Sequence, residues 1–325
     1  MRTSSSAAAP ATSGPTSGAA PGITRQEALD RIAAASAAAP GEWIVAQGTY
    51  RQDLPTRADL DARLPGVPVV VRLSMHRLVA SSAALAASGI SRSTGDPVGS
   101  RIGRDAAGEP TGVIEEGFDL MAIPPVEHAR LREALDRSMR TQFLQHGVTT
   151  VYELPASADG MRTYQQMHRE GALPIRLTLN PIVRPGHQPI ASFDDFLATG
   201  IQTGLGDDRL RIGALKIFVD GDDDAALWRR ALDQDPRRWG VATRTYQELS
   251  AQVLAAFGAG IQLWIHAIGD VAQEMTISAI EDARRAYPDL DARPRIEHIA
   301  CSYWDPSYVA RMQRAGIIPV PTAAF

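Results

Sequence analysis

Hydrophobic and polar positions along this chain follow two periods, that of amphipathic helices and that of buried strands. Residues 1–22 follow neither, because they are mostly Ala, Ser, Gly, Pro and Thr, and we expect them to form a disordered leader. A helix is expected after Thr24, because Thr24 and Glu27 have the spacing of a capping box and the Ala-rich run that follows ends at Pro40. The apolar, β-branched run at 67–73 predicts a buried strand.

Residues 74–120 interrupt this regularity. They contain several Gly, Ser and Pro residues and the turn-like sequence STGDPVGS. We therefore expect irregular structure around short helices there, as an excursion from the main fold.

Beyond residue 125, strand-like and helix-like segments alternate along the chain. Strand-like segments lie at 147–154, 173–183, 210–221, 261–270, 293–300 and 316–325. Helix-like segments lie at 126–146, 158–170, 246–259, 271–287 and 305–315. Strands separated by a helix's worth of residues indicate βα units and a parallel sheet, and the number of units favours a (β/α)8 barrel with too few strands to close it. We expect a leader (1–22), an N-terminal helix with an insertion segment (23–125) and a partial β/α barrel (126–325).

The composition narrows the class of protein. Hydrophobic residues make up 44% of the 325 positions and charged residues 22%, as in ordinary globular proteins. A net charge of −4 supplies no basic excess for a nucleic-acid backbone, and no apolar run reaches the ~18 residues that span a bilayer. We therefore expect neither nucleic acid nor a membrane as partner. The single Cys301 forms no internal disulfide, which indicates a cytoplasmic protein.

Candidate chemistry lies where the predicted strands end, because the active site of a β/α barrel is built at the carboxyl ends of its strands. The polar residues at these ends are Glu153, Lys216, Asp220, His266, Asp270, Glu297 and His298. Strand alternation places Lys216 and Asp220 on one face. Two histidines on successive parallel strands can meet at one point, which is a geometry that metal ions use.

Lys216 is the only lysine among 33 lysine and arginine residues, and its neighbours are apolar. Burial and a nearby metal both favour the neutral amine, which can react with carbon dioxide to give a carbamate, an anionic ligand able to bridge two metals. The alternative is a snorkelling or salt-bridged lysine. The histidines can equally be hydrogen-bonded core residues, and Glu153 and Glu297 can pair with arginines.

Eight motifs, in order from about Thr24 to the C-terminus, carry a family resemblance. They are GEWIVAQG, PTRADLDARLPGVPVVVR, SSAALAASGI, GEPTGVIEE, GVTTVYEL, LRIGALKIFVDG, IHAIGD and RIEHIA. Together they resemble amidohydrolase family 3, the YtcJ-like branch of the metal-dependent amidohydrolase superfamily. The resemblance implies a β/α barrel with a small β-sandwich, and hydrolysis of non-peptide C–N bonds in amides, formamides or cyclic amides by metal-activated water.

Residue by residue, the resemblance implies that Lys216 is a carboxylated bridging lysine and that His266 and His298 are metal ligands. His76 matches a family histidine in the insertion that approaches the substrate. The cofactor it implies is a divalent metal, most simply zinc, with one or two ions in the family. The loop DDDAALW after Gly221 departs from the family's Ser-rich loop.

The chain also departs from the family at both ends. None of its seven histidines forms the His-x-His of the first strand, and the sequence stops at Phe325, before the eighth strand that supplies an Asp. We therefore expect strands two to seven of the barrel without strands one and eight or the sandwich, and at most one metal ion. Asp220 and Asp270 are then the candidate catalytic carboxylates, and Glu153 joins His76 as a candidate substrate contact.

Two functions of different classes follow. The first is a truncated amidohydrolase, active or inactive, acting on a small amide-type molecule. The second is a non-catalytic half-protein that pairs with another polypeptide supplying the missing strands, or with a second copy of itself. A lyase or an isomerase on the same barrel also stays open, because a fold does not fix its chemistry.

Overall fold

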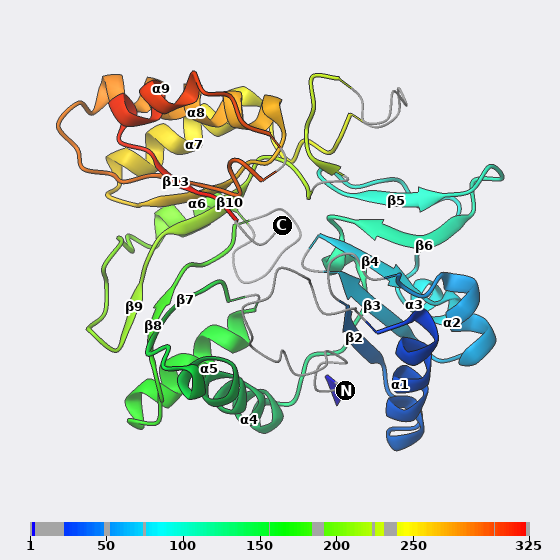
Figure 1. Ribbon diagram of the computed structural model, residues 1–325. Coiled ribbons are helices and arrows are strands. Elements are labelled where there is room, and N and C mark those ends of the chain that lie inside the picture. The colour runs from blue at the N-terminus through cyan, green and yellow to red at the C-terminus, as the bar shows by residue number, and fades with distance from the viewer. Residues whose placement is uncertain are drawn as a thin grey trace. The chain divides into compact units, whose positions relative to one another are not determined.

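The computed structural model describes residues 2–3, 23–48, 53–73, 76–155, 157–183, 192–222, 225–230, 239–301 and 303–322. The chain divides into two compact units, Met1–Glu127 and His128–Phe325, drawn from blue to cyan-green and from green to red in Figure 1. The expected boundary at residue 125 lies two residues from the observed division. Each unit is described by itself below.

Unit 1 is built on a six-stranded sheet with the order β1-β2-β3-β4-β6-β5. Its strands are β1 (Arg2–Thr3), β2 (Ile44–Gly48), β3 (Val69–Leu73), β4 (Arg77–Ala80), β5 (Arg101–Arg104) and β6 (Pro110–Glu115). Its helices are α1 (Arg25–Ala38), α2 (Arg57–Arg63), α3 (Ser82–Ala87) and the 3-10 turn η1 (Phe118–Leu120). The pairs from β1 to β3 are parallel and the remaining pairs are antiparallel.

Local sequence explains how α1 begins. Thr24 Oγ1 accepts the backbone N–H of Glu27 at 3.2 Å, and the Glu27 carboxylate accepts the backbone N–H of Thr24 at 2.7 Å. The predicted capping box is therefore confirmed. Of the predicted leader, only Arg2–Thr3 is described, and it pairs with Ile44 and Val45 of β2; the rest of that stretch lies outside the described residues.

The short helices expected at 74–120 are confirmed by α3 and η1, but the expectation of irregular structure around them is wrong, because this segment contributes three of the six strands. The Gly, Ser and Pro residues form the connections between them. β6 alternates buried and partly buried residues, which is the period of a half-buried strand. Strands as short as β4 and β5, with four residues each, carry too weak a pattern to stand out from the turns around them.

Unit 2 consists of parallel strands and helices, so the predicted α/β class is confirmed. The strands form two sheets, β7-β8-β9 and β10-β11-β12-β13. They are β7 (Thr150–Glu153), β8 (Arg176–Leu179), β9 (Leu210–Ile212), β10 (Leu215–Phe218), β11 (Leu263–His266), β12 (Arg295–Glu297) and β13 (Ile318–Val320). The helices are α4 (His128–Ser138), η2 (Met139–Phe143), η3 (Leu144–His146), α5 (Ala158–Arg169), α6 (Phe193–Ala198), α7 (Tyr246–Gly258), α8 (Asp270–Ala286) and α9 (Tyr308–Ala315).

The two sheets of unit 2 are joined through Lys216. Its N–H donates to the Pro181 carbonyl at 2.8 Å and its carbonyl accepts the N–H of Val183 at 2.9 Å. β9 and β10 together occupy one predicted strand segment. Through the hydrogen bonds of Lys216, the six predicted segments form one run of parallel strands. All six strand predictions and the five predicted helices of this unit are confirmed, whereas α6 was not predicted.

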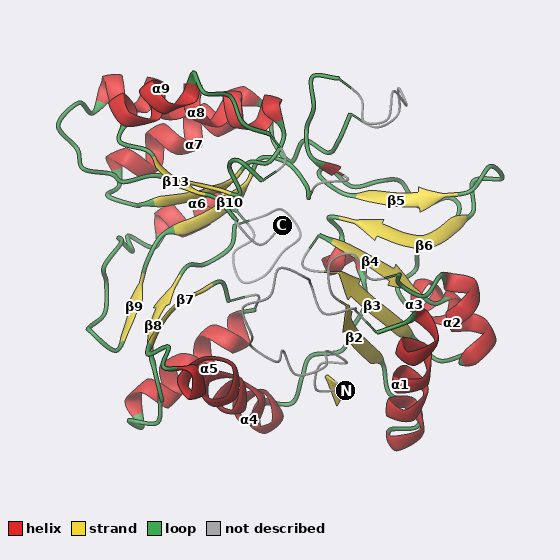
Figure 2. Cartoon of the chain, in the orientation of Figure 1, coloured by secondary structure: helices red, strands yellow, loops and turns green. Residues whose placement is uncertain are grey.

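Helices cover one face of this run of strands. Figure 2 shows α7, α8 and α9 layered against β10 to β13. The core between them contains Leu215 and Ile217 of β10 and Leu263 and Ile265 of β11. Because side chains alternate along a strand, the residues between these core positions point to the opposite face. That face carries the candidate chemistry. Among the described residues, no helix combines the length and apolar character needed to cross a bilayer.

Candidate functional site

Lys216 lies in β10, level with Trp264 of the neighbouring strand β11. Only 1% of the residue is exposed, and its Nζ lies 5.1 Å from the centroid of the Phe218 ring. The closest carboxylate given by the structure is Glu297, whose Oε2 lies 4.0 Å from Nζ. The prediction of a buried lysine is therefore confirmed, and its one ion-pair contact among the described residues lies at the limit of the range.

Burial is the main influence on the charge of this lysine. It lowers the pKa of Lys216 to about 8, the Glu297 carboxylate opposes this shift, and the Arg295 guanidinium adds to it. An amine with a pKa of about 8 is substantially neutral under mildly alkaline conditions, unlike an exposed lysine with a pKa near 10.4. Lys216 therefore has nucleophilic character that the arginines of this chain lack.

The two candidate histidines lie side by side. His266, at the end of β11, is fully buried, and His298 directly follows β12. Their ring centroids are 4.8 Å apart, with the planes at 61°. The sequence prediction that two adjacent strands bring these imidazoles together is therefore confirmed as geometry.

Hydrogen bonds select the tautomer of His266. Its Nε2 lies 3.0 Å from the Gly221 carbonyl oxygen, which only accepts, so Nε2–H is the donor and Nδ1 carries the lone pair. In His298, Nδ1 lies 2.8 Å from the hydroxyl of Thr322. Each ring is thus held through one nitrogen, which is how metal-ligating histidines are usually oriented.

The backbone at His298 is strained. Its φ is +66°, and Ala300 has the same value, although neither residue is glycine. Left-handed conformations of such residues cost about 1–3 kcal/mol and cluster at functional sites. The N–H of His298 donates to the Val320 carbonyl at 2.9 Å, so β13 holds this turn in place.

Asp220 connects the end of β10 to the loop after β11. Its Oδ1 accepts the N–H of Ile268 at 3.1 Å, and its Oδ2 accepts those of Gly269 and Leu227 at 2.8 and 3.0 Å. Oδ1 also lies 3.5 Å from Nε2 of His266. Both oxygens of this buried carboxylate are therefore engaged with the backbone, and the residue holds His266 and its loop together.

The other two candidate carboxylates have different surroundings. Asp270 begins α8 and accepts the backbone N–H groups of Arg229 and Val271 at 2.8 and 2.9 Å. Burial raises the pKa of Glu153, and a side-chain hydrogen bond from Tyr164 of α5 opposes this shift. Glu153 thus faces the helix layer, opposite to the face of Lys216. The structure does not bring it to the site.

The sequence analysis did not single out the aromatic surroundings of Glu297. Arg295, two residues earlier on the same face of β12, lies 3.2 Å from Glu297 Oε1. Its guanidinium carbon is 3.9 Å from the Trp264 ring centroid and 6.0 Å from that of Tyr152. Strand alternation applied to RIEH was the signal that could have revealed Arg295.

His76 lies in unit 1 and forms a pair that the sequence analysis also missed. Its Nδ1 is 2.7 Å from Oε1 of Glu116. The Glu116 side chain is fully buried and its φ is +53°. A buried carboxylate in a strained backbone, fixed to a histidine, is a feature expected at functional sites. The last glutamate of GEPTGVIEE, Glu116, carried no signal in the sequence, because carboxylates at the end of a strand normally face solvent.

The donor set limits what the site can hold. Within the described ranges, no group of three or more His, Cys, Asp or Glu side chains is arranged to bind a metal ion. His266 and His298 supply two imidazoles, so a metal here needs a third ligand of another kind. Lys216 is a buried group on the same face of the strands as His266.

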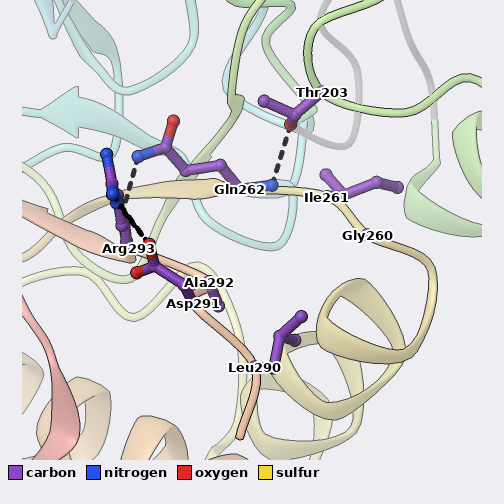
Figure 3. A pocket seen from close by; sticks show the side chains of 8 residues that line it. All are labelled: Thr203, Gly260, Ile261, Gln262, Leu290, Asp291, Ala292 and Arg293. Carbon is purple, nitrogen blue, oxygen red and sulfur yellow. Dashed lines mark hydrogen bonds and ion pairs between the residues drawn. The ribbon is translucent and has the colours of Figure 1, made fainter.

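A pocket of about 400 Å³ lies at the opposite end of the strands (Figure 3). Its lining residues, Thr203, Gly260, Ile261, Gln262, Leu290, Asp291, Ala292 and Arg293, precede β11 and β12 or lie nearby. The Arg293 guanidinium pairs with Asp291 at 2.8 Å, and the Gln262 amide donates to the Arg293 carbonyl. These groups satisfy one another, and the pocket is remote from the carboxyl ends of the strands, so we assign it no chemistry.

Comparisons with known proteins complete the picture. A family model described as "Amidohydrolase family" matches residues 17–323. The putative amidohydrolase YtcJ of Bacillus subtilis is 32% identical over 256 residues, covering 74% of this chain and 46% of the relative. The N-substituted formamide deformylase of Arthrobacter pascens is 30% identical over 285 residues, covering 80% of this chain and 50% of the relative. The chain thus spans about half the length of the curated relatives it matches.

Solved structures agree on the fold. An uncharacterised metal-dependent hydrolase from Pyrococcus horikoshii OT3 matches with a TM-score of 0.63 and 22% identity, covering 91% of this chain and 56% of that chain. A second one, from Pyrococcus furiosus, matches with a TM-score of 0.60 and 21% identity, covering 91% and 58%. Both similarities concern the arrangement of strands and helices.

Proposed function

The chain belongs to the amidohydrolase family, and from that premise we propose that it is part of a metal-dependent hydrolase of non-peptide C–N bonds in small amides, formamides or cyclic amides. The observation that carries this proposal is the buried Lys216 on the same face as the contacting rings of His266 and His298. One relative is an N-substituted formamide deformylase, which supports this bond type. The structural neighbours are metal-dependent hydrolases, which supports metal dependence.

We propose that this site takes a single divalent ion. We assign Nδ1 of His266, Nε2 of His298 and Lys216 as ligands, with Lys216 carboxylated, and zinc as the metal. Two imidazoles and one anionic oxygen are a donor set that zinc accepts. When bound, the ion lowers the pKa of a coordinated water and polarises the carbonyl to be attacked. We place the site inside a partial (β/α)8 barrel.

The chain's own residues prepare this site. The Gly221 carbonyl and the Asp220 carboxylate hold the proton of His266 on Nε2, which keeps the lone pair on Nδ1. The Thr322 hydroxyl orients the ring of His298 through a hydrogen bond at Nδ1. Asp220 is therefore a positioning residue in this proposal. Asp270, at the start of α8, keeps one oxygen outside its described backbone contacts and is the better candidate proton acceptor.

Metal content tests the proposal. The full chain, reconstituted with zinc and bicarbonate, is expected to hold about one ion, measured by plasma emission spectrometry. Lys216→Met fills the same buried volume but cannot form a carbamate, and His266→Ala with His298→Ala removes two ligands. Both variants are expected to lose at least about tenfold in zinc affinity, because even the loss of a group that only supports a ligand costs that much at other metal sites. His128→Ala, at an exposed position of α4, is the matched control.

One outcome would contradict the proposal. If Lys216→Met and the double histidine variant fold, as judged by circular dichroism, and bind zinc as well as the wild type, the assigned ligands are wrong. A carbamate adds the mass of carbon dioxide to Lys216, which native mass spectrometry reads independently of activity. Hydrolysis is then assayed with N-substituted formamides and N-acyl amines.

A second function is favoured by the edges of the unit 2 sheets. In the described part of the chain, β7 pairs only with β8, and β13 pairs only with β12. Ile318 of β13 is 40% exposed, and Tyr152 of β7 is 52% exposed. Unpaired edges with apolar side chains favour strand addition. Under this proposal unit 2 pairs with a further polypeptide or with a second copy of itself.

A further inference from the structure

The strands of unit 2 carry a second row of polar side chains, closer to their amino ends than His266. Trp264 of β11 and Arg295 of β12 lie opposite each other, and His266 lies opposite Glu297 two residues further along. Because side chains alternate along a strand, Trp264 and Arg295 lie on the face that carries His266. At about 3.3 Å per residue, the two rows are about 7 Å apart.

Tyr152 of β7 meets this row from the other sheet of unit 2. Its ring centroid lies 5.4 Å from that of Trp264, with the ring planes at 39°. The strands therefore curl toward this face, and they can be followed from β7 to β13 in Figure 1. Tyr152 is 52% exposed, so solvent reaches this part of the face. We call Tyr152, Trp264 and Arg295 the Arg295 group.

The guanidinium of Arg295 is held by aromatic rings. Its carbon lies 3.9 Å from the ring centroid of Trp264 and 6.0 Å from that of Tyr152. Its Nε lies 3.2 Å from Oε1 of Glu297, yet neither of these two buried atoms has a hydrogen-bond partner. In the described part of the chain, nothing accepts a hydrogen bond from this guanidinium. The Arg295 side chain is 24% exposed, so a ligand can reach it.

Trp264 is a second donor without an acceptor. The residue is only 5% exposed, and its indole Nε1 is buried with no hydrogen-bond partner. Buried donors without a partner are rare in folded proteins and destabilise them. The amine of Lys216, level with Trp264, has its one described carboxylate contact at 4.0 Å. Donors therefore outnumber acceptors in this part of the face, which favours an anionic oxygen ligand.

We propose that the Arg295 group binds the carboxylate of a small acidic amide, such as an N-acyl amino acid. The planar guanidinium takes the carboxylate through two parallel hydrogen bonds, and the Trp264 ring supports it from behind. The amide group then lies one row further along the strands, beside Glu297 and His266.

The charge of the ligand follows from the same residues. Arg295 and Lys216 are two basic side chains that share one described carboxylate, that of Glu297. One further negative charge balances them, whereas a dianion such as phosphate exceeds the balance. The Arg295 group is therefore suited to a monocarboxylate.

This inference deepens the proposed amide hydrolysis, because it names a substrate class for the same site in unit 2, and it rests on that function for its meaning. Binding of a carboxylate by Arg295 requires neither hydrolysis nor metal. Failure of the zinc experiment leaves this binding standing, and failure of this binding leaves the zinc ligands standing.

Calorimetric titration of the full chain with N-acetylglycine tests the proposal, both as purified and after dialysis against a chelator. In both states the wild type is expected to bind N-acetylglycine at least about tenfold more tightly than N-acetylglycine amide, because the neutral amide cannot form the charge-assisted hydrogen bonds. Arg295→Gln is expected to lose the same factor. Arg293→Gln is the matched control, since Arg293 lies two residues earlier, pairs with Asp291 and is expected to bind like wild type.

Four results would overturn the proposal: no binding of N-acetylglycine, equal binding of the neutral amide, a preference that disappears with the metal, or unchanged binding by folded Arg295→Gln. Inorganic phosphate binding as tightly as N-acetylglycine would also contradict it, because the site would then be a general anion site. If Arg295→Gln does not fold by circular dichroism, Arg295→Lys gives the reading, because it keeps the charge but loses the bidentate geometry. Unchanged binding by Arg295→Lys contradicts the proposal.

Discussion

At the scale of single residues, the unusual feature of unit 2 is a lysine in surroundings that disfavour its charge. Lys216 lies beside Phe218 and level with Trp264, on the face opposite to the helices, with one described carboxylate at 4.0 Å. A buried ammonium with so little compensation destabilises the fold. The residue is therefore better explained by chemistry than by stability.

This placement predicts a pH dependence of stability in metal-free protein. The pKa of Lys216 is lowered to about 8 in the folded state, so between about pH 8 and 10.4 the unfolded chain binds more protons than the folded one. The free energy of unfolding should rise with pH in this window, by up to about 1.4 kcal/mol per unit from this group. Urea titrations of wild type and Lys216→Met give the measurement. A slope that is the same in both proteins contradicts the assignment.

At the scale of elements, the junction of β11 and α8 decides where His266 lies. Gly269 caps α8 and donates its N–H to Asp220, while Leu227 packs across it. A Cβ added at Gly269 would lie 2.1 Å from the Leu227 carbonyl oxygen. Only glycine permits this approach, so the glycine of the motif IHAIGD, Gly269, is required for packing.

We therefore expect Gly269→Ala to destabilise the chain by about 1–3 kcal/mol, because backbone must move to accept the methyl group. Chemical denaturation monitored by circular dichroism measures this change. Gly95→Ala is the control, since a Cβ there meets nothing within 4 Å. Equal stability of the two variants would show that the Leu227 segment yields freely.

At the scale of the whole molecule, each unit buries its own apolar clusters. The parallel strands of unit 2 position Lys216, His266 and His298. Within the described residues, β13 pairs on one side only and leaves an edge with an exposed apolar side chain, Ile318. A strand that pairs on one side only presents unpaired backbone groups to another chain.

Association at β13 follows from this edge. Ile318→Lys should shift the chain toward the monomer in light scattering coupled to size exclusion, because a charged edge opposes strand pairing. Val309→Lys is the matched control, since Val309 is 41% exposed on α9 against 40% for Ile318. A wild type that is monomeric at all concentrations, or a control that dissociates equally, argues against pairing at this edge.

Much of unit 2 was predictable from sequence because its strands are apolar runs separated by helices, and alternation then assigns a face to each residue. Unit 1 was less predictable, because short strands between glycine-rich turns have no decisive period. Glu153 shows a further limit: its position at a strand end was correct, yet the half-buried strand β7 turns it toward Tyr164.

The sequence by itself determined the βα rhythm, the burial of Lys216 and the pairing of two histidines on neighbouring strands, because these depend on local period and strand order. Only the tertiary structure decided what surrounds them: Asp220 engaged by three backbone N–H groups, Glu116 fixed to His76, and Arg295 stacked on Trp264. These contacts join residues far apart in the chain, and no local pattern encodes a distance between them.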